Sequence, residues 1–433
     1  MNTVKVTWKN LGYNFTILFL LLPTLVMVAT FCYTPAFEAI RHSLYVWDGE
    51  YVEEFVGLKN FHNLVGDLGL WAPLLLGAVC SFASALAPDG KKKIIFRILG
   101  AIGYLGAAVF FFIDYKVAGD EVSKGTPMTF LMVLLGAVVL CALLSIQKNN
   151  VKLRKWTLFL AYFLPFISGL VYIIGVRQMG DWLLWMSFKL IFILIAANLI
   201  KMWPSIFTAV CIHRLASERW QYIYRVLFVI PMIIPSIVML LLWKFFYDPN
   251  VGFLNQLLMW TGIDKILIWA DANMLHWGVF NTPFKPVWLG EPDLVIPALI
   301  FWGFPWVGVV GVLIYLSGLQ NISQSVYEAA DLDGVSSWGK FTYIELPLIM
   351  TQIRLNLILM VIGTFQAYGF QLMLLGPEGG PNNKGLTPGL YMFYKAFIEN
   401  EYGYACAVGM LLFFIILILT IINQKFVRSR ANG

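Results

Sequence analysis

Long apolar runs recur along the whole chain and limit what it can fold into. A helix that crosses a membrane needs about 20 consecutive, mostly apolar residues. About ten stretches approach or exceed that length, namely 12–33, 70–87, 94–113, 127–146, 156–176, 186–212, 224–247, 294–319, 348–375 and 405–424. Each is expected to be a helix, because a backbone surrounded by lipid must satisfy its own hydrogen bonds. Charged residues make up only 12% of the 433 residues, too few to cover a water-soluble globule. The sequence therefore predicts an all-α integral membrane protein.

Basic residues set the expected orientation. The net charge is +6, but the lysines and arginines stand in short clusters between apolar runs, which is a topology signal rather than a nucleic-acid patch. If the N-terminus lies inside and every run crosses, the inside segments hold about twice as many basic residues as the outside ones. We therefore expect both termini in the cytoplasm.

Patterns typical of enzymes and metal sites are missing from the sequence. The five cysteines lie in or beside apolar runs and the four histidines are scattered, so neither disulfides nor metal ligands are expected. The segment from Gly334 to Lys340 resembles a phosphate-binding loop, but Phe341 stands where a hydroxyl is needed. No acidic residue lies in the middle of a run, which argues against a proton-coupled transporter. We expect no catalytic, cofactor-binding or metal-binding residue.

One predicted cytoplasmic loop, at about 323–347, carries folding signals of its own. Ser325 and Glu328 have the spacing of a capping box, so a short helix is expected to begin at Val326. Gly334 then suits the end of this helix, where a left-handed backbone is needed. The loop is therefore expected to fold rather than to trail between two membrane helices.

A second short helix is expected after the glycine. Ser336 or Ser337 can cap it, and Pro347 suits the first turn of the next membrane helix. Ala329 and Ala330 give the first helix a small, smooth face. Such an elbow is either a docking device for another protein or an amphipathic loop that lies on the membrane, and these signals alone favour neither.

The same loop is similar to the coupling motif of ABC importer permeases, E-A-A-x-x-D-G followed by I-x-L-P. The matching residues are Glu328, Ala329, Ala330, Asp333, Gly334, Ile344, Leu346 and Pro347. In that family the elbow sits in a cleft of the ATP-hydrolysing subunit and transmits its closure to the membrane helices. Other segments resemble the carbohydrate branch, the maltose-transporter permease and its relatives: 55–67, 225–258, 376–381 and 401–409.

The resemblance implies a six-helix importer core and a chain that hydrolyses no ATP itself. The partners it implies are a second, homologous permease, two ATPase subunits and an extracytoplasmic solute-binding protein. The implied location is the bacterial cytoplasmic membrane, and the implied function is the uptake of a sugar or sugar-derived solute. A secondary transporter or a polytopic scaffold without an ATPase is the alternative.

One part of the chain departs from the family. Residues 1–69 resemble the first core helix and its outer segment, and residues 177–433 resemble the rest of the core with its elbow. Between them, 70–176 contains four additional apolar runs. Four is an even number, so this inserted segment leaves the expected orientation of the core unchanged. A lateral scaffold or partner-binding bundle is the interpretation we favour.

Candidate solute-binding residues follow from the chemistry of sugars. A neutral solute rich in hydroxyls needs amides and aromatic faces, and 348–375 offers Gln366, Tyr368 and Gln371. By position, the first two fall where the maltose permease contacts its sugar. Trp302 and Trp306 precede the elbow and can stack on a sugar ring, or they can be interfacial or packing residues.

Three lysines fall within the apolar runs. Lys189 and Lys244 lie near predicted outer ends and are expected to extend to the interface. Lys201 lies deeper, beside Asn198, and a charge at that depth is a candidate for a functional role.

Overall fold

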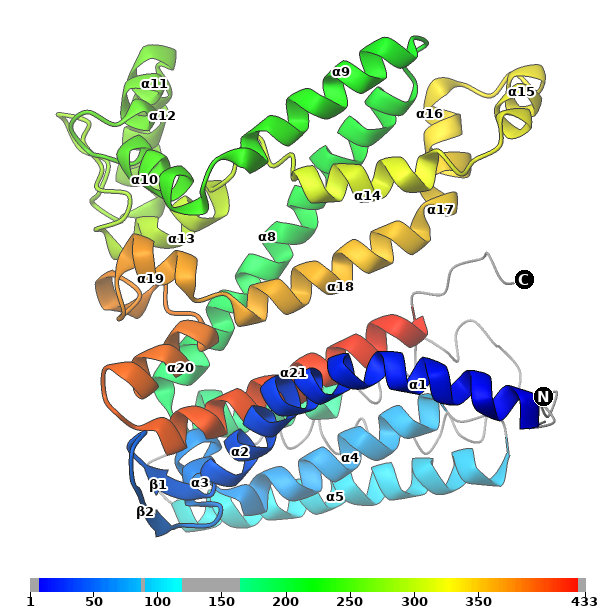
Figure 1. Cartoon of the computed structure of the whole chain (residues 1–433). Helices are drawn as coiled ribbons and strands as arrows, with labels where there is room; N and C mark the ends of the chain where they lie inside the picture. The colour runs from blue at the N-terminus through cyan, green and yellow to red at the C-terminus, as the bar shows by residue number, and fades with distance from the viewer. Residues whose placement is uncertain (1–7, 87–89, 119–163, 427–433) are drawn as a thin grey trace, which may run out of the picture. The chain divides into compact units, whose positions relative to one another are not determined.

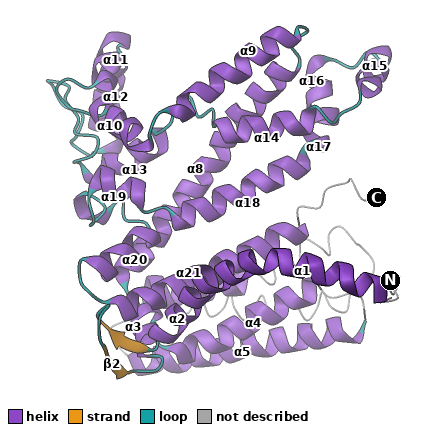
Figure 2. Ribbon diagram, viewed as in Figure 1, coloured by secondary structure: helices purple, strands orange, loops and turns teal. Residues whose placement is uncertain are grey.

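Helices make up nearly all regular structure in the part of the chain that the computed structural model describes, residues 8–86, 90–118 and 164–426 (Figures 1 and 2). The chain divides into two compact units. Unit 1 comprises Met1–Phe55 and Met186–Gly433, and unit 2 comprises Val56–Trp185. The predicted run 127–146, and the part of 156–176 before residue 164, lie outside the described residues.

Unit 2 is built around two helices that pack along their length. Its described elements are α3 (Lys59–Val65), α4 (Leu68–Leu86), α5 (Lys91–Ala118) and the π-helix η3 (Val171–Val176), which ends a helix from Leu164. A Cβ on Gly103 of α5 would lie 2.4 Å from the backbone nitrogen of Gly77 on α4. Glycine at both positions therefore lets the two backbones approach closely, as small residues do between membrane helices.

A polar network joins α5 to the segment after η3. Tyr172 donates a hydrogen bond of 2.8 Å to the carboxylate of Asp114, and Arg177 pairs with the same carboxylate at 3.0 Å. The unit extends beyond the predicted insertion, 70–176, at both ends. The backbone N–H of Asp181 donates to the carbonyl of Leu64, which joins the two flanking segments, 56–69 and 177–185, to each other.

Within its described residues, unit 1 contains three long, largely continuous apolar helical stretches. These are α1 (Trp8–Val28) with the π-helix η1 (Ala29–Tyr33) and α2 (Thr34–His42), then α8 (Trp182–His213), which begins in unit 2, and α21 (Tyr402–Phe426). The start of α1 and the end of α21 point toward the same end of unit 1 as the elbow (Figure 1). Which side of a membrane that end faces stays a prediction.

Three runs that the sequence analysis expects to be continuous helices are interrupted, and that expectation is wrong. The run 224–247 forms α9 (Glu218–Val229), the 3₁₀ turn η4 (Ile230–Ile233) and α10 (Ser236–Phe246), with a bend of 86°. The run 294–319 forms α13 (Pro292–Phe301) and α14 (Val309–Leu319), separated by non-helical residues, and 348–375 forms α18 (Met350–Gln366) and α19 (Gly369–Leu375). Figure 2 shows the non-helical segments.

Backbone chemistry explains the breaks. Pro235 precedes α10 with an extended backbone (ψ of 137°) and has no N–H to donate. Gly303 has a φ of +76°, outside the helical region. Non-helical backbone is tolerated at membrane depth only where protein buries it or where it lines a cavity. These breaks are therefore expected to be buried by protein or to line a cavity.

The two long segments between apolar runs, 34–69 and 248–293, are folded. A hairpin pairs β1 (Tyr45–Trp47) with β2 (Val52–Phe55) in antiparallel fashion, and 248–293 contains α11 (Phe253–Thr261), α12 (Ile263–Ala270) and the π-helix η5 (Asp271–Leu275). Four backbone N–H groups, of residues 277–280, donate to the buried carboxylate of Asp271. These bonds, that from Phe280 foremost, hold the pKa of Asp271 below its ordinary value. Toward the C-terminus, η7 (Pro381–Asn383) and α20 (Pro388–Phe397) lead to α21.

Length and composition allow several crossings. Four of the described helices are long and apolar enough to span a membrane, and up to eight spans result if each strongly bent pair counts as one. The total of ten membrane-spanning helices, expected from the apolar runs, stays a prediction.

Candidate functional site

The elbow folds as two short helices around a glycine. The first, α15 (Gln324–Leu332), bends by 74° from the axis of α14 and forms the tip of unit 1 on this side (Figure 1). Gly334 follows with a φ of +68°. The N–H of Val335 donates to the carbonyl of Ala330 at 2.9 Å, and that of Gly334 to Asp331 at 3.1 Å. This pair of bonds is the Schellman motif, which ends a helix at a left-handed glycine.

The beginning of the elbow differs from the prediction. The N-cap is Ser323, with an extended backbone, so Ser325 lies inside the first turn instead of capping it. The two serine hydroxyls are 3.0 Å apart. The expected alanine face is also incomplete, because Ala329 is exposed while Ala330 is buried.

The second half of the elbow leads back into the membrane helices. Ser336 caps α16 (Ser337–Lys340) by accepting a hydrogen bond of 3.1 Å from the N–H of Gly339. The π-helix η6 (Phe341–Glu345) and α17 (Leu346–Leu348) follow. Pro347 lies in α17, before a bend of 66°, and not in the first turn of the long helix α18.

An ion pair ties this half of the elbow to the end of α8. Arg214 donates to the carboxylate of Glu345 through Nε at 2.9 Å and Nη2 at 2.7 Å, and Nη2 also donates to the carbonyl of Ser337. Tyr327 of α15 donates to the same carboxylate at 3.3 Å. Glu345 is fully buried, and its hydrogen bonds raise the pKa of the Arg214 guanidinium above its ordinary value. The carboxylate therefore joins α8, α15 and η6.

The outer surface of the elbow carries exposed apolar side chains. Leu332 is 91% exposed and Tyr343 is 83% exposed, and Trp338 is also largely exposed. Glu328 and Asp333 lie exposed on the same short stretch of chain. Apolar side chains rimmed by acids are typical of a surface that contacts another protein.

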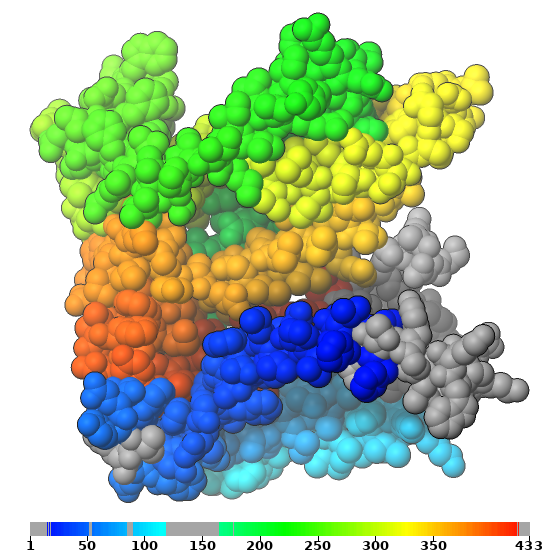
Figure 3. Space-filling model, viewed as in Figure 1, coloured from blue at the N-terminus to red at the C-terminus, as the bar shows by residue number. Residues whose placement is uncertain are grey.

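A cavity of about 770 Å³ lies in unit 1 where the helices are broken. It is lined by residues of α8, η4, α13, α14, α18 and α19 and of the breaks after α13 and α18. Figure 3 shows the opening, with the dark green surface of α8 at its floor between yellow, orange and lighter green segments. The volume is within the range of small-molecule sites.

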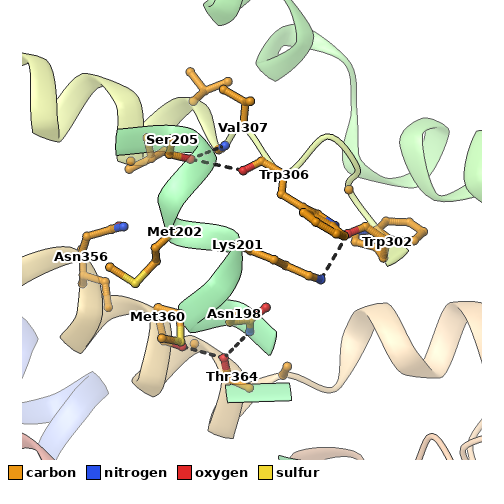
Figure 4. Close-up of a pocket in the computed structure, with 18 of the residues that line it drawn as sticks. Asn198, Lys201, Met202, Ser205, Trp302, Trp306, Val307, Asn356, Met360 and Thr364 are labelled. Carbon is orange, nitrogen blue, oxygen red and sulfur yellow. Dashed lines mark hydrogen bonds between the residues drawn. The ribbon is translucent and has the colours of Figure 1, made fainter. Parts of the chain in front are cut away.

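Helix α8 supplies most of the polar contacts in this cavity (Figure 4). Asn198 donates to the hydroxyl of Thr364 at 3.1 Å. Ser205 accepts from the N–H of Gly308 at 2.9 Å and so holds the break before α14. Lys201 donates to the carbonyl of Trp302 at 3.3 Å and lies 5.9 Å from the ring centre of Trp306.

The structure brings only some of the predicted solute-contact residues together. Trp302, Trp306 and Gln371 line the cavity. Gln366 and Tyr368 are exposed and lie outside its lining, because the chain turns away at the break between α18 and α19, and Tyr368 stacks on a neighbouring phenylalanine. Whether any of the five contacts a solute stays a prediction.

Other lining residues escaped the sequence analysis. They are polar side chains within apolar runs: Ser205, Asn356 and Thr364. A scan for such polar residues would have found them, since uncharged polar groups at membrane depth also need partners.

Similar proteins fall in one group. The family model described as "Binding-protein-dependent transport system inner membrane component" matches residues 202–432. The probable ABC transporter permease protein YesP of Bacillus subtilis is 31% identical over 57% of this chain and 73% of its own length. The diacetylchitobiose uptake system permease protein NgcF of Streptomyces coelicolor is 30% identical over 50% of this chain. The match covers 55%, about half, of that relative's own length.

A solved structure also aligns with the chain. It is a bacterial ABC transporter involved in the import of the acidic polysaccharide alginate, with a TM-score of 0.48 and 18% identity over 69% of this chain and 98% of that one.

Proposed function

Since the chain belongs to the family of binding-protein-dependent transport system inner membrane components, we propose that it is the permease subunit of an ATP-driven importer for a sugar or sugar-derived solute. The proposal gives it the partners that the motif implies: a second permease, two ATPase subunits and an external solute-binding protein. Relatives named for the uptake of diacetylchitobiose and lactose support the class of solute.

The observation that carries the proposal is the elbow and its attachment. Exposed Leu332 and Tyr343 offer an ATPase subunit an apolar surface beside the matched motif residues. The Schellman motif at Gly334 gives the elbow a defined shape. A contact on α15 would therefore move a folded body rather than a loose loop.

The path from the elbow to the solute runs along α8. The ion pair between Arg214 and Glu345 joins the elbow to the end of this helix. The same helix carries Asn198, Lys201 and Ser205 into the cavity. Closure of the ATPase subunits would thus reach the cavity through a rigid helix, and hydrolysis would reset it.

Substitution of the exposed Leu332 tests whether the elbow docks on an ATPase subunit. Leu332→Asp is expected to lose the ATPase subunits from the purified complex, because a charge replaces a 91% exposed leucine that contributes little to the fold. Trp260→Asp on α11 is the matched control, since Trp260 is 84% exposed and far along the chain from the elbow. Retention of the ATPase by both variants, as judged by co-purification, would refute docking through α15.

A second experiment tests coupling. Gly334→Pro removes the N–H that bonds to Asp331 and cannot adopt a φ of +68°, and Glu328→Lys reverses an exposed motif charge. Each is expected to abolish solute-stimulated ATP hydrolysis and uptake in proteoliposomes. If both activities survive unchanged, the elbow is not the coupling element. Uptake by a preparation without any ATPase would instead support the secondary-transporter alternative.

A further inference from the structure

Lys201 lies in the interior of α8, well away from both ends of the helix. The residue is about 18 Å of helix from His213, the end of α8, and further from the other end, at 1.5 Å per residue. A lysine side chain extends only several ångströms, so it reaches neither end of α8. Its ammonium group is held at the cavity instead (Figure 4).

The charge of Lys201 has no counter-ion within the described cavity. Of the described residues that line it, none is acidic and Lys201 alone is charged. Its one recorded hydrogen bond goes to the carbonyl of Trp302, although an ammonium group has three donors. A charge at membrane depth is costly unless it is paired, and charges kept there usually mark a substrate path.

Two more polar groups at the same cavity have no hydrogen-bond partner among the described residues. They are the indole N–H of Trp306, a donor, and the amide oxygen of Gln371, an acceptor on a side chain that is only 4% exposed. Buried polar groups are normally satisfied. A ligand with both acceptors and hydroxyl donors would satisfy both.

The backbone at Trp306 is strained in the same place. Its φ is +62°, a conformation that bulky side chains rarely adopt. Hydrogen bonds from the N–H of Trp306 to the carbonyl of Gly303, at 2.7 Å, and from Ser205 to the carbonyl of Trp306, at 3.4 Å, hold this conformation. Strain of this kind concentrates at functional sites, and here it keeps an indole beside the ammonium group of Lys201.

We propose that this cavity receives an acidic saccharide, whose carboxylate pairs with Lys201 while its ring packs on Trp302 and Trp306. The idea rests on the proposed function and narrows it from sugars in general to sugars that carry an anionic group. Phe370 lies with its ring centre 4.0 Å from that of Trp302 and extends the aromatic wall. Aromatic faces select a ring, amides select hydroxyls, and the lone cation selects the carboxylate.

Equilibrium binding to the purified complex, without its solute-binding protein, tests this proposal, because the binding protein would impose its own selectivity. The probes are radiolabelled uronate oligosaccharides, the same oligosaccharides reduced to neutral sugars at their carboxyl groups, sulfated oligosaccharides and inorganic phosphate. The variants are Lys201→Met and, as the matched control, Lys189→Met, whose side chain is exposed on the same helix and does not line the cavity.

The expected result is a preference for the uronate form that depends on Lys201. Lys201→Met should weaken uronate binding by roughly tenfold to a hundredfold, the range of one hydrogen bond to a charged group, and leave neutral saccharides within about twofold. Lys189→Met should change neither. Sulfated forms that bind as the uronates do would identify a general anionic saccharide.

Several results would overturn the proposal. Equal affinity of the wild type for uronate and neutral forms would do so. An equal loss of both in Lys201→Met would do so too, because it would indicate that Lys201 supports the shape of the cavity and does not pair with a carboxylate. If phosphate competes as well as the uronates do, the cavity is a plain anion site. If no saccharide binds at all, the cavity is not a saccharide site. If ATPase subunits co-purify with the chain in any of these cases, the proposed importer function is retained. If they do not co-purify, the importer function itself is refuted.

Discussion

Lys201 of α8 and Arg214, the residue directly after α8, are basic residues in opposite surroundings. Arg214 makes three recorded hydrogen bonds and shares a fully buried carboxylate with Tyr327. Lys201 meets a single carbonyl and no acidic residue of the described cavity lining. A fully satisfied network fixes one geometry, whereas a buried polar group without its partners is costly. Under the proposed function, the satisfied network belongs to the region that transmits movement and the unsatisfied cation to the region that receives solute.

The largest loss of stability is expected when the ion pair between Arg214 and Glu345 is broken. Arg214→Met leaves Glu345 buried without its cation and should destabilise the purified complex by about 2–4 kcal/mol, toward the lower end of the range for such pairs because Arg214 is 31% exposed. Thermal unfolding in detergent measures the loss. The double variant Arg214→Met and Glu345→Leu should recover most of it, since two apolar residues replace both charges. A double variant as unstable as the single one would show that the carboxylate is not the cause.

A smaller effect is expected from the glycine of the elbow. Nothing lies within 4 Å of a Cβ built on Gly334, so Gly334→Ala carries only the strain of a left-handed backbone, about 1–2 kcal/mol. Gly262, with a φ of +75° and equally open surroundings, is the matched control. Both variants should lose similar stability, but only Gly334→Ala should lower the uptake per ATP hydrolysed. If uptake per ATP hydrolysed is the same in the two variants, the elbow has no special role in coupling.

A smaller loss of stability is expected when a hydrogen bond between two helices at the cavity is removed. Asn198→Ala removes the hydrogen bond from α8 to Thr364 of α18 and should cost about 0.6 kcal/mol, the average for such bonds in membranes. Thr364→Val removes the other end of the same bond, so the double variant should lose no more than the larger single loss. Additive losses measured by thermal unfolding would show that the two side chains act separately.

The smallest change in stability is expected at Lys201. Lys201→Met removes a charge that has no acidic partner in the described lining and should leave the melting temperature unchanged or slightly higher. A loss as large as that of Arg214→Met would contradict the comparison, because it would make Lys201 a structural residue.

The local features of the elbow could be predicted from sequence. Gly334 and Ser336 signal their conformations within a few residues, and both predictions are confirmed. The N-cap was misplaced because two serines, Ser323 and Ser325, offer similar chemistry and the chain direction after α14 selects between them. Local signals therefore predict a helix end better than a choice between neighbouring caps.

Contacts between distant segments could not be predicted in the same way. Arg214 and Glu345 are 131 positions apart, and neither carries a local sign of the other. Hydropathy also passes unbroken through the interruptions before α10, α14 and α19, so Gln366 and Tyr368 were expected to lie beside Gln371 in one helix. The resemblance to importer permeases, in contrast, rested on matched spacing in the elbow and is confirmed by the family match.

The most direct measurement is solute-stimulated ATP hydrolysis by the reconstituted complex that carries the double variant Arg214→Met and Glu345→Leu. The account predicts that this complex retains its ATPase subunits and its basal hydrolysis but no longer responds to solute, because the elbow has lost the ion pair that joins it to the end of α8 and keeps aromatic packing on Phe207 of that helix. Stimulation equal to that of the wild type would contradict the claim that movement reaches the cavity through this pair.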